Sequence, residues 1–193
     1  QLIKKTNTIP NVVAVSAKNR FKKRKLSISK SKWLKNYLEA TKKNNVDTIV
    51  ELIGGAEGPA KTLVFGALKN KKNVVTANKA LIAKYGDKLA KIAEKNKVNL
   101  EFEAAVAGGI PILRTIKEGL ATNKITKVYG ILNGTCNYIL SEMEKSKDSF
   151  INVLKKAQSL GYAEPGEPKY DLNGFDAFAK VRILSSLAFH KKI

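Results

Sequence analysis

Residues 48–55 read Thr-Ile-Val-Glu-Leu-Ile-Gly-Gly, and this stretch decides the class of fold. Its first six residues are mostly apolar and β-branched, which predicts a buried strand that ends at the two glycines. Residues 59–70 follow with helical spacing and begin with a proline, which is favoured in a first helical turn. A second apolar run, residues 73–76, predicts the next strand. Strand, helix and strand at this spacing indicate a βαβ unit, in which the two strands run parallel.

The same alternation continues on both sides of this unit. Apolar runs predict buried strands over residues 11–16 and 98–104, and helical spacing predicts helices over 32–44 and 79–97. Gly86 is the position where the second helix is open to interruption. Apolar strands that alternate with helices predict an α/β fold, here part of a Rossmann-type doubly wound parallel sheet with helices on both faces.

The pattern changes after Gly109, where helices dominate. We therefore expect a dinucleotide-binding domain over residues 1–107 and the start of a second, α+β domain over residues 108–193. The elements predicted in the second domain are a helix opened by Pro111, a strand at 127–132, helices at about 138–145 and 150–160, and a long helix that follows Gly174 and ends at His190.

The chain is strongly basic, with 36 lysines and arginines, 16 acidic residues and a formal net charge of +20. Such a balance is compatible with a nucleic-acid partner. The lysines, however, are spread along the chain, and aromatic residues, only 7% of the total, do not alternate with the basic runs as a stacking surface requires. We therefore expect solvated helix faces and no nucleic-acid partner, and keep a basic nucleic-acid-binding protein as the alternative.

Other totals limit the location and the chemistry. Cys136 is the only cysteine, so no intramolecular disulfide can form, which fits a reducing cytoplasm. No run of about 18 apolar residues exists, and no apolar segment typical of a signal peptide follows Gln1. We expect a cytoplasmic protein without a membrane partner. Because His190 is the only histidine, a histidine-based metal site or triad is not expected, and Cys136 is interpreted as a packed residue.

Polar, glycine-rich segments follow the predicted strands at their carboxyl ends, where ligands bind in parallel sheets. Gly54 and Gly55 follow one strand, and Thr76, Asn78 and Lys79 end the next and follow it. Glycines can simply make tight turns, but several such segments at one sheet edge favour a site. We predict that these five residues bind a dinucleotide cofactor.

The phosphate-binding motif G-x-G-x-x-G is absent from these 193 residues. If residues 11–16 form the second strand of the sheet, we expect the first strand and the phosphate loop before Gln1. Lys18 and Arg20 would then lie near the adenosine ribose, where basic side chains suit a 2′-phosphate. This favours NADP as the cofactor and leaves NAD open.

Residues 158–184 concentrate carboxylates and one notable lysine. Asp176 and Lys180 are four apart, so on a helix they share one face, which continues through apolar Ile183, Leu184 and Leu187. A lysine beside carboxylates in partly dry surroundings can give or take a proton. The alternative is an ordinary surface ion pair, which contributes little to stability.

The chain resembles the homoserine dehydrogenase family from Asn11 onward. Five segments carry the resemblance in order: residues 50–55 (VELIGG), 76–83 (TANKALIA), 102–111 (FEAAVAGGIP), 130–140 (GILNGTCNYIL), and 174–180, which starts with Gly-Phe-Asp and ends at Lys180. The resemblance implies a homodimer that interconverts aspartate 4-semialdehyde and homoserine with NAD(P), in the route to threonine, methionine and isoleucine. It also implies that residues 108–193 are the start of the catalytic, substrate-binding and dimerisation domain.

It also implies roles for single residues. Lys79 would contact both cofactor and substrate, Glu164 and Asp171 would bind the substrate ammonium, Asp176 would help to hold the substrate, and Lys180 would donate the proton. A monovalent cation such as Na⁺ would bind near the domain junction, mostly through main-chain carbonyls. Its ligands would be Glu103, Val106, Gly108 and Ile110.

The chain departs from the family pattern in two respects. It has one extra residue in the Pro165-Gly166 segment, and glutamate at position 167 where the family usually has aspartate. The extra residue can shift Glu164 relative to Asp176. We also expect the 193 residues alone, without a first strand or the rest of a catalytic domain, to be inactive and poorly soluble. A non-catalytic remnant that keeps the family pattern is therefore a further alternative.

Overall fold

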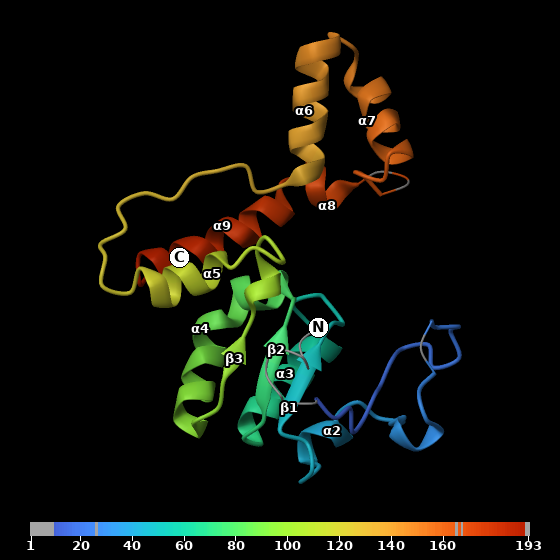
Figure 1. The fold of residues 1–193 in the computed structure, drawn as a ribbon, viewed down its shortest axis with the longest axis vertical. Helices are drawn as coiled ribbons and strands as arrows, with labels where there is room; N and C mark the ends of the chain where they lie inside the picture. The colour runs from blue at the N-terminus through green and yellow to red at the C-terminus, as the bar shows by residue number, and fades with distance from the viewer. Residues whose placement is uncertain (1–9, 26, 165, 167, 192–193) are drawn as a thin grey trace.

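The computed structural model describes residues 10–25, 27–164, 166 and 168–191 (Figure 1). A parallel sheet lies at the centre of the N-terminal half, in the order β1 (Thr48–Glu51), β2 (Asn73–Thr76) and β3 (Leu100–Glu101). Thr48 pairs with Asn73, and Val74 pairs with Leu100. The predicted parallel α/β arrangement is therefore confirmed.

Two helices connect these strands: α3 (Pro59–Lys69) and α4 (Lys79–Asn96). Each crossover moves one strand further in the same direction, and right-handed crossovers then place both helices on one face of the sheet. Ile49 and Val74 are buried on that face, whereas Val50 and Val75 on the other face are 61% and 41% exposed. Within the described residues the helices thus cover one face, where the sequence predicted both.

A single hydrophobic core joins this sheet to the C-terminal helix α9 (Phe175–Ala188). Leu68 and Leu81 are fully buried, and each contributes roughly 2 kcal/mol relative to an exposed leucine. Ile183 and Leu184 belong to the same cluster, so α9 packs on α4. This packing brings the first turns of the two helices together. The predicted domain boundary at residue 107 stays a prediction.

The second half is mostly helical and rises above the sheet (Figure 1). Helices α6 and α7 form a hairpin with a small core of its own, made by Ile139, Val153, Ala157 and Ala163. Asn133 caps α6 and Ser149 caps α7, as expected for residues whose side chains accept a main-chain N–H. The elements are η2 (Glu103–Ala105), α5 (Ile112–Arg114), the π turn η3 (Thr115–Gly119), α6 (Gly134–Ser146), α7 (Phe150–Ser159) and α8 (Lys169–Leu172).

Two elements predicted near the N-terminus are wrong. Residues 11–16 do not form a buried strand: Val15 makes one isolated bridge to Trp33, and Val12 is 55% exposed. The predicted helix over 32–44 is replaced by η1 (Lys30–Lys32) and the single turn α2 (Glu39–Lys42). The Asn36 side chain accepts the Leu38 N–H at 2.9 Å, a local turn that competes with a continuous helix.

Later elements also differ from expectation. The predicted strand at 127–132 is extended chain without a ladder among the described residues, and Tyr129 there is 86% exposed, because no described strand lies beside it. The strand predicted at 98–104 shortens to β3, since η2 begins at Glu103. The helix predicted from Pro111 becomes α5 and η3, while α4 continues through Gly86 without interruption.

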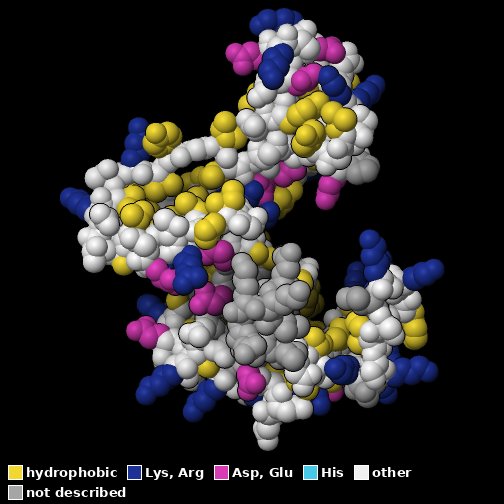
Figure 2. Space-filling view, viewed as in Figure 1, with side chains coloured by type: hydrophobic (Ala, Val, Ile, Leu, Met, Phe, Trp, Pro, Cys, Tyr) yellow, Lys and Arg dark blue, Asp and Glu magenta, His cyan; other side chains and the backbone are white. Residues whose placement is uncertain are grey.

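Lys and Arg side chains are scattered over the face shown in Figure 2, with Asp and Glu among them, rather than gathered in one patch. This distribution agrees with the interpretation of the lysines as solvated helix faces. Among the described residues, no helix is both long and apolar enough to cross a membrane.

Candidate active site

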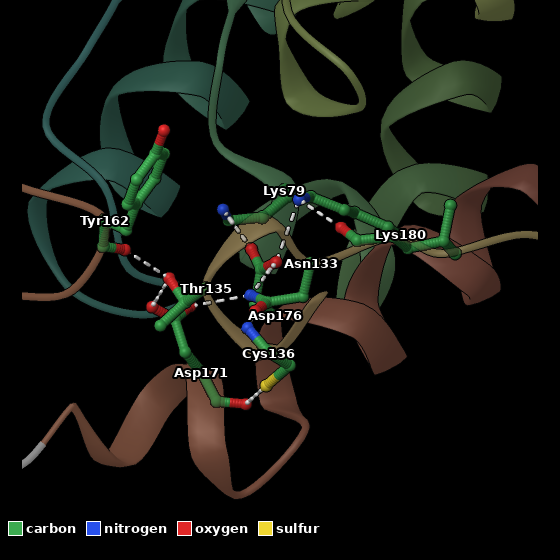
Figure 3. A network of polar contacts seen from close by, with 9 residues as sticks. Lys79, Asn133, Thr135, Cys136, Tyr162, Asp171, Asp176 and Lys180 are labelled. Atoms are coloured by element: carbon green, nitrogen blue, oxygen red, sulfur yellow. Dashed lines mark hydrogen bonds and ion pairs between the residues drawn. The ribbon is translucent and has the colours of Figure 1, made fainter. Parts of the chain in front are cut away.

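Three segments meet where α4 and α9 begin: the first turn of α4, the first turns of α9, and the coil before α6 (Figure 3). Lys79 occupies the first position of α4 because Asn78 caps that helix, with its Oδ1 accepting the Leu81 N–H at 3.0 Å. Asp176 and Lys180 share one face of α9, as their spacing predicts. The starts of α4 and α9 and the coil before α6 therefore converge on one point.

Asp176 is the centre of this site and is only 3% exposed. Its Oδ1 accepts from Lys79 Nζ, and its Oδ2 accepts from Lys180 Nζ at 2.8 Å and from Asn133 Nδ2 at 2.9 Å. Burial alone would raise the pKa of the Asp176 carboxyl, but hydrogen bonds from Lys180, Lys79 and Asn133 together lower the pKa to about 2. Asp176 is therefore a fixed negative charge at neutral pH.

Lys180 has one hydrogen left for a ligand. Its Nζ donates to Asp176 Oδ2 and to the main-chain oxygen of Leu132 at 2.7 Å. An ammonium group carries three hydrogens, and within the described part of the chain no third acceptor contacts Lys180. Its side chain is 18% exposed. Lys180 is thus held rigidly and can still donate to a bound molecule.

Asp171 lies beside this ion cluster and is held by neutral groups. Its Oδ1 accepts from Asn133 Nδ2 at 2.9 Å. The single hydroxyl hydrogen of Thr135 is shared between Asp171 Oδ2, 3.1 Å from Thr135 Oγ1, and the main-chain oxygen of Tyr162, 2.7 Å away. No lysine or arginine of the described residues pairs with Asp171. This carboxylate is available to a cationic group of a ligand.

The loop that follows β1 lies on the other side of Lys79 and is held rigidly at the end of β2. Glu51 is 1% exposed, and its carboxylate accepts from the Ile53 N–H at 2.6 Å, the Gly54 N–H at 3.0 Å and the Thr76 hydroxyl. Asn78 Nδ2 donates to the Gly55 oxygen at 2.7 Å. These bonds hold the loop after β1 against the end of β2.

The loop needs its glycines. Gly54 and Gly55 have φ angles of 85° and 80°, which side chains rarely adopt. Among the described residues, no atom lies within 4 Å of a Cβ placed at Gly54, so no described residue covers the loop at this point. A flat ligand can approach the main chain closely here, at the carboxyl ends of β1 and β2.

The structure brings together some of the predicted residues and not others. Lys79, Asp171, Asp176 and Lys180 form one network, and Thr76, Asn78, Gly54 and Gly55 border it. Glu164 lies on an exposed loop, where its main-chain oxygen accepts from Gln158 and its side chain bonds to no described residue. Lys18 and Arg20 are exposed in the basic N-terminal loop, with the Arg20 guanidinium 5.8 Å from the Trp33 ring. The roles of these residues stay predictions.

The segment predicted to bind a cation is tightly curled. Positive φ angles at Ala107 (51°) and Gly109 (91°) turn the main chain between Glu103 and Ile110. The Glu103 carboxylate accepts the N–H groups of Leu113 and Arg114, both at 2.9 Å, so it caps α5. Main-chain oxygens are then the ligands that Glu103, Val106, Gly108 and Ile110 can offer, which suits a hard cation. Over the residues described, no cluster of His, Cys, Asp and Glu suits a metal ion.

Sequence reasoning missed three groups of the site: the Leu132 oxygen, the Asn133 amide and the Thr135 hydroxyl. A signal existed for Asn133, since an asparagine directly before a helix is a typical N-cap. Cys136 follows in the same turn, and the pKa of its thiol is raised, first by burial and then by Asp171 and Asp176. A thiol held in its neutral form agrees with its interpretation as a packed residue.

These features define a class of protein: an α/β chain with a Rossmann-like parallel sheet, whose strand-end loops meet a lysine–carboxylate site on a second, mainly helical part. Residues 2–103 match the family model described as the NAD binding domain of homoserine dehydrogenase, and residues 111–193 match the model described as homoserine dehydrogenase. The chain belongs to the homoserine dehydrogenase family. This membership does not favour the alternative of a nucleic-acid-binding protein.

Individual relatives agree. A homoserine dehydrogenase of Neisseria gonorrhoeae is 50% identical over 157 residues, which cover 81% of this chain and 36% of the relative. A crystal structure of S. aureus homoserine dehydrogenase at pH 6.0 has a TM-score of 0.82 at 41% identity, covering 100% of this chain and 47% of that one. A hyperthermophilic archaeal homoserine dehydrogenase in complex with NADPH has a TM-score of 0.74 at 28% identity, covering 81% and 48%. The chain thus spans less than half the length of these relatives.

Proposed function

We propose that the protein is a homoserine dehydrogenase, which interconverts L-aspartate 4-semialdehyde and L-homoserine with NAD(P) in the synthesis of threonine, methionine and isoleucine. The observation that carries this proposal is the buried Asp176, which holds Lys79 and Lys180 at the point where the strand-end loop meets α9. Reduction of an aldehyde needs a hydride donor on one side and a proton donor at the oxygen, and Lys180, which keeps one hydrogen for a ligand, can be that proton donor.

In this reaction Lys180 would transfer the proton, and Asp176 would hold Lys180 in position. A bound nicotinamide supplies the hydride. As the aldehyde oxygen gains negative charge, the free hydrogen of the Lys180 ammonium stabilises it and is then transferred to it. Asp176 keeps the Lys180 ammonium in place, with the Leu132 oxygen as the second anchor. In the direction of homoserine oxidation, Lys180 takes the hydroxyl proton back.

The substrate's amino-acid end needs an opposite charge. Asp171 presents a carboxylate held by two neutral donors, so its charge is free to bind the substrate ammonium. Glu164, on the exposed loop before α8, would close over the same group. Lys79 is 33% exposed at its side chain and lies between Asp176 and the strand-end loop, so it can contact both substrate and cofactor.

The remaining assignments form part of the same proposal. Gly54, Gly55, Thr76 and Asn78 border the nicotinamide half of the cofactor, while Lys18 and Arg20 favour NADP through its 2′-phosphate. The curled segment from Glu103 to Ile110 would hold a monovalent cation such as Na⁺. The protein would act as a cytoplasmic homodimer without a nucleic-acid partner.

The test uses the protein expressed from its complete reading frame. NADPH and NADH absorbance is followed with aspartate 4-semialdehyde for the wild type and for Lys180→Ala. Lys84→Ala is the matched control, since Lys84 lies on α4 and pairs with Glu57, an exposed carboxylate before α3. We expect turnover by the wild type and by Lys84→Ala, and a loss of about 10²–10⁴-fold in kcat for Lys180→Ala. Equal activity of the two variants would remove Lys180 from the mechanism, and a wild type that binds neither cofactor would refute the proposed reaction.

A further inference from the structure

The side chain of Asn133 lies between the two aspartates of the site and contacts both. Asn133 is 8% exposed, and its Nδ2 donates one hydrogen to Asp171 Oδ1 and the other to Asp176 Oδ2, each at 2.9 Å. Its Oδ1 accepts the Cys136 N–H at 2.8 Å. Every polar atom of the amide therefore has a partner (Figure 3).

We propose that Asn133 is a positioning residue that holds Asp171 and Asp176 at a fixed separation and reserves Asp171 for a cationic group of the substrate. This inference rests on the proposed function, because the cationic group is the ammonium of an amino-acid aldehyde or alcohol. It adds a role for a residue that is neither an acid, a base nor a direct ligand.

The amide can lie in one orientation only. A flip would point Oδ1 at two carboxylates and the NH₂ group at the Cys136 N–H, so three hydrogen bonds would become three repulsive contacts. Asn133 thus ties the start of α6 to α8 and α9 at once. The preceding residue, Leu132, contributes its main-chain oxygen to Lys180. The consecutive residues Leu132 and Asn133 therefore contact Lys180 and Asp176, respectively.

A neutral donor is the residue type that this position requires. A lysine or arginine would place a positive charge beside both carboxylates and so compete with the cationic group of a ligand for Asp171. An aspartate would add a third negative charge within hydrogen-bond distance of two others. The asparagine amide stabilises the carboxylates without neutralising them. The two lysines satisfy Asp176, and the charge of Asp171 remains available.

Asn133 also has a purely structural role, because it caps α6. Substitutions separate the two roles. Asn133→Ser keeps a capping oxygen but has a single hydrogen to donate, and Asn133→Asp keeps the cap and the size but loses both donors. Ser149→Ala is the matched control, since it removes the cap of α7, away from the site.

The experiment measures kcat and KM for aspartate 4-semialdehyde and the Kd of NADPH, using the protein from its complete reading frame. For Asn133→Ser we expect kcat/KM to fall roughly 10- to 100-fold, mainly through KM, and for Asn133→Asp to fall further, with the Kd of NADPH within about twofold of the wild type. Kinetics in both variants no worse than in Ser149→Ala would overturn the proposal.

A second readout does not depend on activity. The carboxyl NMR signal of Asp176, assigned through the Asp176→Asn variant, is followed against pH in the wild type and in Asn133→Ser. We expect Asp176 to titrate at higher pH in the variant, because its charged form loses the hydrogen bond from Asn133 that helps to lower its pKa. Unchanged titration would overturn the role of Asn133 even if the enzyme proved to have another substrate, whereas changed titration without turnover would count against the proposed reaction alone.

Discussion

Two clusters in this molecule each combine one carboxylate, two lysines and one neutral hydrogen-bond donor, but they differ in burial. Asp176 binds two lysines and the Asn133 amide, and its side chain is 4% exposed. Glu57 binds Lys61 and Lys84, each at 2.8 Å, and the Tyr85 hydroxyl, and its side chain is 53% exposed. The pKa of each carboxyl is lowered to about 2 by these partners.

The difference shows what turns an ion cluster into a site. Around Glu57, water solvates and screens every charge, and such pairs contribute little to stability. Around Asp176, the desolvated charges hold one another in fixed positions, and Lys180 keeps a hydrogen for a ligand. Each cluster has one i,i+4 ion pair and one ion pair to α4, in which Asp176 pairs with Lys79 and Glu57 pairs with Lys84. Burial, rather than the number or the sequence separation of the ion pairs, therefore marks the functional cluster.

Removal of the central carboxylate in each cluster gives the largest contrast. Asp176→Asn leaves two lysines at a buried junction without their counter-charge, and we expect the free energy of unfolding to fall by about 3 kcal/mol. Glu57→Gln should leave the free energy of unfolding almost unchanged, because water replaces the lost partner. Denaturant unfolding of the two variants checks this. If Glu57→Gln proved the more destabilising, the inner cluster would not be the one that holds α4 to α9.

Lowering the pH should reduce the difference in stability between the wild type and Asp176→Asn, and this effect is smaller than that of the substitution itself. The folded-state pKa of Asp176 lies near 2, below its ordinary value of 3.8, so its ionised form stabilises the fold above about pH 4 and this contribution is lost as the pH falls through 2. Between pH 5 and pH 3 we expect the stability gap between the two proteins to narrow by about 1 kcal/mol. Urea unfolding at both pH values measures this gap. A constant gap would mean that the carboxylate titrates normally in the folded state.

Local patterns predicted the elements that depend on local sequence. The apolar runs at β1 and β2 and the proline that opens α3 all lie within a few residues of what they determine. The i,i+4 pair of Asp176 and Lys180 was also visible in the spacing. These parts of the fold and of the site were predicted correctly because short-range physics sets them.

Several errors and omissions concern features that need a distant partner. Residues 127–132 have strand composition, but a strand forms only beside another strand, and no sequence pattern locates that neighbour. Asn133 reaches Asp171 and Asp176, which lie 38 and 43 residues away, so its spacing carries no information about the contact. Neither periodicity nor the family resemblance predicted that Lys79 pairs with Asp176, 97 residues away.

Salt gives the smallest and most selective effect. The Debye length falls from about 20 Å near 20 mM salt to about 4 Å near 500 mM, so exposed charges lose most of their mutual attraction while buried pairs lose little. We expect any difference in thermal midpoint between the wild type and Glu57→Gln to disappear at the higher concentration, and the difference between the wild type and Asp176→Asn to persist. Thermal scans of the three proteins at both concentrations make the comparison. Equal sensitivity of the two differences would show that water reaches Asp176 as freely as Glu57, and a lysine held in such a solvated cluster could not serve as the fixed proton donor proposed here.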